Sequence, residues 1–298
     1  DGRLFDDGVV FRLGFDHFWV TTTTGNTDAA FAWLEHCRQN LFRSRAFIVP
    51  VQSQWANAVI CGPRSRDLLA SIGTDIDLDR DAFPFMAMRA GHVGGLAARV
   101  FRVSFTGELS YEINVAASHG AALWAQLMEA GNIFDITPLG SEANHVLRIE
   151  KGYISIGHEG DGTATPFDLT LDRFVAMEKA DFIGKRALED DLFDRPRPRR
   201  ELVGLLPTDP KVVLPEGAQV LAASTDSEAI GFVTASVMSP TLRRSIALAL
   251  VDDGRDRQET SVHVTLGAGR KNDRRHQRAE ALVTPALFFD PTGARLRG

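Results

Sequence analysis

Arg102-Val-Ser-Phe-Thr-Gly-Glu-Leu-Ser-Tyr-Glu-Ile113 combines a strand pattern, a turn and a second strand pattern in one short stretch. Leading into it, Phe101, Val103 and Phe105 alternate with Val100, Arg102 and Ser104. This period of two predicts a strand. Thr106-Gly-Glu108 then interrupts the pattern, and Gly107 can adopt backbone conformations that other residues resist. The stretch therefore predicts a hairpin.

The second strand of this hairpin places Glu112 on a rigid element. Tyr111, Ile113 and Val115 share one predicted face, and Glu112 and Asn114 share the other. A carboxylate accepts two parallel hydrogen bonds, so Glu112 could bind a flat heterocycle that carries N–H donors. The local pattern alone favours a plainer alternative, a hairpin with a solvated glutamate on its polar face.

Length and composition limit the class of protein. The chain has 298 residues, enough for one large domain or two ordinary ones, and 44% hydrophobic with 24% charged residues is typical of a soluble globular protein. A net charge of −6 argues against nucleic acid as the main partner. No apolar run approaches a membrane span and no signal peptide is visible. Cys37 and Cys61 fit small buried hydrophobes in a reducing compartment, so we expect a cytoplasmic location.

Helices and strands mix irregularly in the first two thirds of the chain. We expect a hairpin from residues 9–13 and 18–23, a strand at 58–61, and helices at 26–43, 65–72, 118–130 and from Ser141 onward. In the helix at 118–130, Leu123, Trp124, Leu127 and Met128 are expected to face inward. The irregular order predicts an α+β layer, an antiparallel sheet with helices, rather than a doubly wound sheet.

The pattern changes after a basic, proline-marked linker at residues 195–200. Short strands are expected at 202–206, 219–222, 229–234, 245–251, 262–266 and 279–283. Their regular spacing predicts an all-β barrel or jelly roll. We therefore predict two domains, residues 1–194 and 195–298. The basic run at 270–278 lies between two of these strands, which favours a solvated hairpin tip over an RNA-binding patch.

Several familiar catalytic patterns are missing from the sequence. No Gly-x-Gly-x-x-Gly follows a strand, and neither a Walker loop nor a Gly-x-Ser-x-Gly elbow occurs. The eight histidines show no zinc-ligand spacing, so no metal site is expected. Covalent catalysis and metal-assisted hydrolysis are therefore disfavoured.

Two further groups of polar residues could carry chemistry. Adjacent acids on an extended chain point to opposite faces, so only one of Asp6 and Asp7 can face a pocket, where it could orient an amine or shuttle a proton. The alternative is a charged entry to a strand. Arg148 and Glu150 share a predicted helix that is followed by Lys151-Gly-Tyr153, and the alternative here is a solvated helix face with its C-cap.

Several blocks together resemble the aminomethyltransferase family, the T-protein of the glycine cleavage system. They occur in the family's order at residues 4–10, 59–63, 105–112, 147–153, 157–159, 181–188 and 239–247. Each block alone is weak, but together they cover nearly the whole chain. The resemblance implies a T-protein-like folate-binding layer followed by a C-terminal barrel. Because the chain opens at Asp1 without Met, we interpret it as a piece of something longer that lacks the family's N-terminal portion.

A narrower resemblance comes from residues 143–153, 212–219 and 286–295, which are similar to the C-terminal part of heterotetrameric sarcosine oxidase alpha subunits. In such enzymes a flavin oxidises sarcosine, and tetrahydrofolate captures the one-carbon unit as 5,10-methylene-tetrahydrofolate. The resemblance implies FAD, FMN and NAD elsewhere in the complex. The implied partners are the remaining sarcosine oxidase subunits and the N-terminal part of the alpha subunit. Alternatives are a free-standing aminomethyltransferase, a dimethylglycine oxidase-type module, and a scaffold domain without folate chemistry.

The family's site residues carry over position by position. Asp7 matches an acid beside the reactive folate nitrogens, and Glu112 matches the acid that binds the pterin ring. Thr23 replaces a family Asn and Phe105 replaces a Tyr, so both keep shape but lose hydrogen bonds.

The block at residues 147–153 adds Arg148 and Tyr153 to the cofactor-binding residues that the resemblance implies. Asn144 stands where the T-protein has an Arg. That difference counts against transfer from a lipoyl carrier and favours capture of a one-carbon unit inside a complex.

Overall fold

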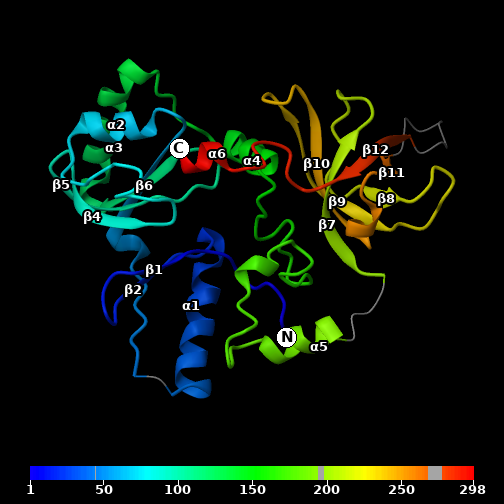
Figure 1. Ribbon diagram of the computed structural model, residues 1–298, viewed down its shortest axis with the longest axis horizontal. Helices are drawn as coiled ribbons and strands as arrows, with labels where there is room; N and C mark the ends of the chain where they lie inside the picture. The colour runs from blue at the N-terminus through cyan, green and yellow to red at the C-terminus, as the bar shows by residue number, and fades with distance from the viewer. Residues whose placement is uncertain (44, 194–197, 268–276) are drawn as a thin grey trace. The chain divides into compact units, whose positions relative to one another are not determined.

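The computed structural model describes residues 1–43, 45–193, 198–267 and 277–298 (Figure 1). The chain forms two compact units. The barrel unit comprises Asp1–Asp7 and His145–Pro291, and the sheet unit comprises Gly8–Asn144 and Thr292–Gly298. Most of the predicted linker and of the basic run at 270–278 lies outside the described residues. These units group residues that pack together, which does not show which part of the chain folds independently. The domain boundary near residue 195 therefore stays a prediction.

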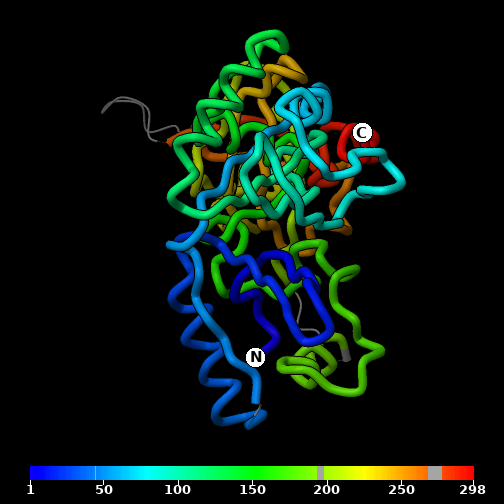
Figure 2. The backbone as a smooth tube through the Cα atoms, turned by 90° about the vertical axis from the view of Figure 1, so that its left-hand side faces the viewer, coloured from blue at the N-terminus to red at the C-terminus, as the bar shows by residue number. Residues whose placement is uncertain are grey.

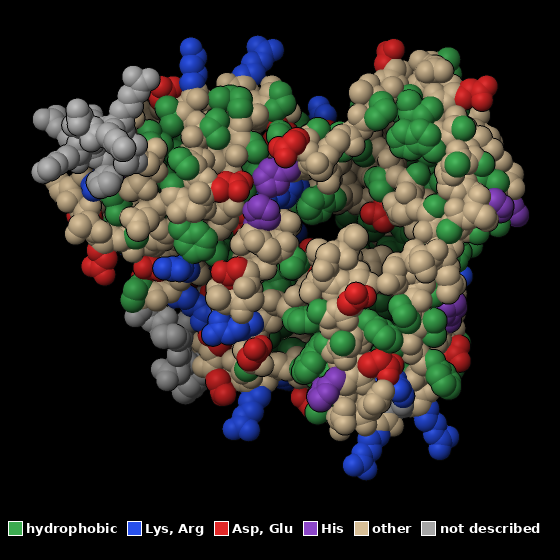
Figure 3. All heavy atoms as spheres, turned by 180° about the vertical axis from the view of Figure 1, so that it is seen from behind, with side chains coloured by type: hydrophobic (Ala, Val, Ile, Leu, Met, Phe, Trp, Pro, Cys, Tyr) green, Lys and Arg blue, Asp and Glu red, His purple; other side chains and the backbone are tan. Residues whose placement is uncertain are grey.

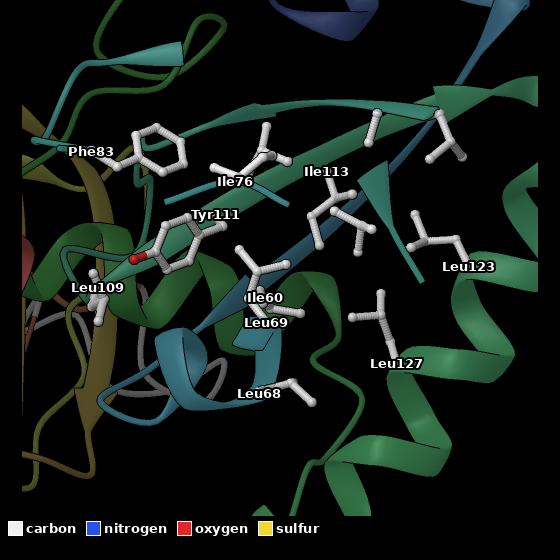
Figure 4. Packing of buried hydrophobic residues seen from close by; sticks show 14 residues of the cluster. Ile60, Leu68, Leu69, Ile76, Phe83, Leu109, Tyr111, Ile113, Leu123 and Leu127 are labelled. Atoms are coloured by element: carbon white, nitrogen blue, oxygen red, sulfur yellow. The ribbon is translucent and has the colours of Figure 1, made fainter. Parts of the chain in front are cut away.

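A four-stranded antiparallel sheet organises the sheet unit. Its order is β3-β6-β5-β4, formed by β3 (Trp55–Cys61), β6 (Ser110–Ala116), β5 (Leu96–Phe101) and β4 (Met88–Val93). Two helices, α2 (Ser65–Ile72) and α3 (Gly120–Gly131), pack on one face. Tyr111, Ile113 and Val115 are fully buried in that core, as the alternation predicted. Figure 4 shows Leu69 of α2 and Leu123 of α3 grouped around Ile60 and Ile113 of the sheet.

Helix α3 buries a narrower stripe than its sequence suggested. Leu123 and Leu127, one turn apart, are 1% and 3% exposed. Trp124 is 53% exposed, so its predicted inward orientation is wrong. A residue next to Leu123 lies about 100° around the helix, outside the stripe that faces the sheet.

The strand before the turn is shorter than predicted, because β5 ends at Phe101 instead of continuing to Phe105. Pairing with β6 ends at Phe101, and only Arg102 continues the pairing on the other side, with the residues just before β4. The Arg102 N–H donates to the Ala87 carbonyl at 2.9 Å, and its carbonyl accepts from the Met86 N–H at 2.9 Å. The Arg102 side chain is 1% exposed, so it does not lie on the solvated face that a continuing strand would give it.

A hairpin and a helix complete the sheet unit. Strands β1 (Val10–Arg12) and β2 (Phe18–Val20) pair antiparallel, which confirms the predicted N-terminal hairpin. Helix α1 (Thr27–His36) follows and continues as a π-helical turn at Cys37–Leu41. Figure 2 shows the chain after α1 returning in the opposite direction toward β3.

The barrel unit confirms the predicted all-β module as a closed antiparallel barrel of order β10-β7-β12-β11-β8-β9. Its strands are β7 (Arg200–Pro207), β8 (Gln219–Leu221), β9 (Gly231–Ser239), β10 (Arg244–Asp252), β11 (Ser261–Thr265) and β12 (Arg278–Thr284). Alternate residues such as Val203, Val233 and Val264 fill its interior. Helix α4 (Ser141–Glu150) places Ile149 in a second cluster with Leu248 of β10. The short helices α5 (Lys185–Phe193) and α6 (Ala294–Arg297) come later in the chain.

Within the described residues, no helix combines the length and the apolar character that crossing a membrane requires.

Candidate functional site

Glu112 lies on the face of the sheet opposite the α2 and α3 core. Its cross-strand neighbours are Val59 of β3 and Phe101 of β5, so the carboxylate stands beside an aromatic ring. The side chain is half buried. Across the described ranges, its carboxylate makes no hydrogen bond or ion pair, and burial raises the pKa of Glu112. A partly desolvated acid without a partner is an unusual feature of a sheet, because such groups normally find one.

The hairpin β1–β2 covers this face of the sheet. The ring of Phe11 lies 4.5 Å from that of Phe101, centroid to centroid, and Trp19 stacks on Phe101 at 5.9 Å. Asn114, the next residue on the Glu112 face, is 6% exposed and accepts a hydrogen bond from Asn57 at 3.1 Å. The solvated polar face that the local pattern favoured is therefore wrong. The polar side of β6 is a partly packed layer.

Sequence reasoning missed Arg99, which belongs to the same layer. Its guanidinium carbon lies 4.9 Å from the Trp19 ring centroid and 4.5 Å from that of Trp55. The two indole rings are themselves in edge contact at 5.2 Å. Burial lowers the pKa of Arg99. Nothing in the sequence pairs this arginine with two tryptophans that lie far from it along the chain.

Thr23 and Phe105 also lie in the sheet unit. Thr23 follows β2 and is partly buried, and its carbonyl accepts the Asn26 N–H at 2.9 Å, which starts the turn into α1. Phe105 is 41% exposed on the turn that leads to β6. That turn requires its glycine, because Gly107 has a φ of 80°, and the Gly107 N–H donates to Ser104 Oγ at 3.0 Å.

The barrel unit contains the other three residues that the sequence pointed to. Asp7 is exposed, and its N–H donates to Asp6 Oδ1 at 2.8 Å. Arg148 is 1% exposed, so the solvated helix face is wrong. Its Nη1 donates to the Tyr153 carbonyl at 3.0 Å and to Glu159 Oε2 at 2.7 Å. Burial raises the pKa of the Tyr153 hydroxyl.

A buried network explains why Arg148 can be desolvated. Glu159 is 0% exposed and balances the arginine charge. The carboxylate also accepts hydrogen bonds from the Ser155 N–H at 3.0 Å and from Thr234 Oγ1 of β9 at 2.7 Å. This pair ties α4 to the following loop and to the barrel wall.

The six candidate residues thus divide into two sets, each described within its own unit. Glu112, Thr23 and Phe105 belong to the sheet unit, and Asp7, Arg148 and Tyr153 belong to the barrel unit. On the face drawn in Figure 3, acidic and basic side chains are interspersed and do not form one field of a single sign. In the part of the chain that the structure describes, no three His, Cys, Asp or Glu side chains are grouped to hold a metal ion.

Comparison with known proteins places this geometry in context. Residues 1–179 match the GCVT N-terminal domain, and residues 200–290 match the glycine cleavage T-protein C-terminal barrel domain. The whole chain is 39% identical to sarcosine oxidase subunit alpha of Corynebacterium sp. strain P-1, but it spans only 30% of that subunit. Aminomethyltransferase of Moorella thermoacetica is 32% identical over 91% of the chain and 71% of the relative.

A solved structure shares the fold. Glycine cleavage system aminomethyltransferase T from Bartonella henselae superposes with a TM-score of 0.79 at 24% identity, over 96% of this chain and 73% of that one. The similarity confirms the predicted combination of an α+β layer and a barrel.

Proposed function

The chain belongs to the glycine cleavage T-protein family, and from that premise we propose that it is the folate-dependent one-carbon transfer region of a sarcosine oxidase. Three sarcosine oxidase alpha subunits match 99–100% of the chain at 37–39% identity, which supports this assignment over a free-standing aminomethyltransferase or a dimethylglycine oxidase-type module. Sarcosine oxidation itself is proposed to occur elsewhere, since the chain spans about 30% of those subunits.

The proposal rests mainly on the environment of the Glu112 carboxylate. A half-buried carboxylate with no partner in the described part of the chain, beside Phe101, fits a flat ring that bears N–H donors. The ionised Glu112 would accept two parallel hydrogen bonds from the pterin, and Phe105 would offer an apolar contact. Thr23 would line the site with a short polar side chain. These contacts orient the ring and hold it away from water.

Asp7 is the proposed acid–base residue. An exposed carboxylate can take up and release a proton as a carbon–nitrogen bond forms at the folate nitrogens. Tetrahydrofolate, when bound, supplies the two nitrogens that capture the one-carbon unit as 5,10-methylene-tetrahydrofolate. Arg148 is buried, so we propose that it acts on the cofactor indirectly, by holding the Tyr153 carbonyl.

The proposed setting is a cytoplasmic heterotetramer. FAD, FMN and NAD would bind to other parts of it, and the partners would be the remaining sarcosine oxidase subunits and the rest of the alpha subunit. The alternative of a different class is a scaffold domain that has lost folate chemistry.

Isothermal titration of the intact enzyme with tetrahydrofolate tests the proposal. Loss of a charge-assisted hydrogen bond costs about 1.5–3 kcal/mol, so Glu112→Gln should weaken binding about 10- to 100-fold. Glu129→Gln, which alters an exposed acid of α3, is the matched control and should bind like the wild type. An intact enzyme that binds no tetrahydrofolate would support the scaffold alternative.

A further inference from the structure

The last residues of the chain pack within the sheet unit although they follow the barrel in sequence. Residues Thr292–Gly298 belong to that unit and include the short helix α6 (Figure 1). Nη1 of Arg295 lies 2.7 Å from Oε1 of Glu108. Glu108 belongs to the turn between Phe105 and Glu112, so this ion pair joins the C-terminal segment to the turn that lies between two proposed ligand contacts.

A buried arginine reinforces the same junction. Nη1 of Arg102 donates to the Phe83 carbonyl at 2.7 Å, and its Nη2 donates to the Arg297 carbonyl. Arg102 thus connects the end of β5 to the C-terminal segment. Leu109, at the far side of the turn, is 4% exposed and lies against Gly298. Both ends of the turn therefore contact residues 297–298.

Other contacts also hold the turn, among them a hydrogen bond between Thr106 and the Cys61 side chain at the end of β3. The Leu109 carbonyl accepts from Ser65 Oγ and from the Gly62 N–H, each at 2.9 Å. These bonds set the start of β6, and the ion pair with Arg295 adds a contact at the Glu108 side chain. The bond from the Gly107 N–H to Ser104 Oγ lies within the turn, so it does not fix the turn against the rest of the unit.

We propose that Arg295 and Glu108 are positioning residues for the ligand site. The ion pair, with Arg102 behind it, holds the turn so that Phe105 and Glu112 meet the ligand in one geometry. The proposal rests on the proposed folate function. Glu108 is partly buried and Arg295 is 53% exposed on its side chain, and pairs of this kind contribute little to global stability. The effect should therefore appear in ligand affinity and in local order of the turn.

Charge reversal in the intact enzyme tests this role. Arg295→Glu and Glu108→Arg should each weaken tetrahydrofolate binding about 5- to 20-fold, which is about 1–2 kcal/mol and lies within the range of coupling between contacting residues. The double reversal should recover affinity to within about 3-fold of the wild type, since it restores an ion pair of opposite polarity. KM for tetrahydrofolate should rise in the single variants with little change in kcat.

Amide hydrogen exchange provides a readout that needs no ligand. Exchange at residues 104–109 should increase in Arg295→Glu and return in the double variant. Arg38→Glu, which breaks the Arg38–Glu35 pair of the same unit, is the matched control and should leave both affinity and exchange unchanged.

The outcomes separate the two proposals. Wild-type binding with unchanged affinity in Arg295→Glu, or a double reversal that restores nothing, overturns the positioning role and leaves the folate function standing. A wild-type enzyme that binds no tetrahydrofolate overturns the folate function and the ligand role of the turn together.

Discussion

The chemistry of a single residue, Glu112, sets the pH dependence expected of the site. Burial penalises its charged form, so the pKa lies above the ordinary value of 4.5. Because the ionised form is the better hydrogen-bond acceptor, tetrahydrofolate affinity should rise as pH increases through this raised pKa. Titrations at several pH values, in wild type and in Glu112→Gln, measure the effect. The difference between the two curves isolates Glu112 from protonation of the ligand, and parallel curves would contradict the prediction.

The raised pKa of Glu112 affects stability in the opposite direction: affinity should rise with pH, whereas the contribution of Glu112 to stability falls. A carboxyl whose pKa is raised on folding contributes stability below 4.5, and this contribution is lost as pH rises through the folded pKa. Ionised Glu112 is thus a cost to the fold at pH values above its raised pKa. A site that keeps such a cost is easier to understand as a binding site than as packing.

The buried pair Arg148–Glu159 leads to a second prediction at the residue scale. Removing one partner leaves the other as an uncompensated buried charge, so Arg148→Ala should lower the free energy of unfolding by about 3–5 kcal/mol. Chemical denaturation of the variant measures this loss. Replacing Arg38, a partly exposed residue that pairs with Glu35 of α1, should cost about 1 kcal/mol or less. A stable Arg148→Ala protein would show that the network is dispensable.

Arg148 also marks the limit of sequence reasoning about residues. Its helix was predictable, but its burial depends on Thr234, which the barrel supplies from far along the chain. Arg99 shows the same limit, because Trp19 and Trp55 become its neighbours only once the hairpin covers the sheet. Residues 102–113 predicted the position of Glu112 correctly, since alternation along a strand is a local property.

Helices and strands were predicted best where a local sequence pattern determines their bounds. Helix α2 has the predicted bounds, and all six barrel strands occur where alternation and turn residues placed them. The strand β5 was overextended because its end depends on Ala87 and Met86, whose backbone pairs with Arg102. A strand pattern can continue after its ladder has ended, and the sequence alone does not show this.

Gly152, between α4 and Tyr153, should not tolerate a larger side chain. It has a φ of 69°, and a Cβ there would lie 1.6 Å from the carbonyl oxygen of Ala286. Gly152→Ala should therefore lower the free energy of unfolding by at least about 2 kcal/mol, through backbone strain and displacement of the segment before Phe288. Gly140→Ala is the matched control, because a Cβ at Gly140 meets no atom within 4 Å. Thermal unfolding compares the two, and equal stability would contradict the close approach.

At the scale of the whole molecule, the order of motifs carried more information than any motif alone. The family and the succession of layer and barrel followed from blocks spread over the chain, and both domain matches confirm them. Which residues belong to each compact unit could not be predicted from the sequence. Residues 1–7 pack with the barrel unit and residues 292–298 with the sheet unit, so each end of the chain contacts residues remote in sequence.

The proposed division of labour in the intact enzyme gives the last prediction. If Asp7 serves only the folate step, Asp7→Ala should slow formation of 5,10-methylene-tetrahydrofolate about 100-fold or more, the usual scale of acid–base catalysis. Sarcosine oxidation should remain close to wild type, because its flavins are proposed to lie elsewhere. With sarcosine labelled in its methyl group, the label should then appear as free formaldehyde instead of the folate product. Asp16→Ala, an exposed acid in the β1–β2 turn, is the control and should keep the label on folate. Equal loss of oxidation and capture in Asp7→Ala would show that the two steps are not separable, and Asp7 would then belong to the structure of the enzyme and not to its one-carbon chemistry.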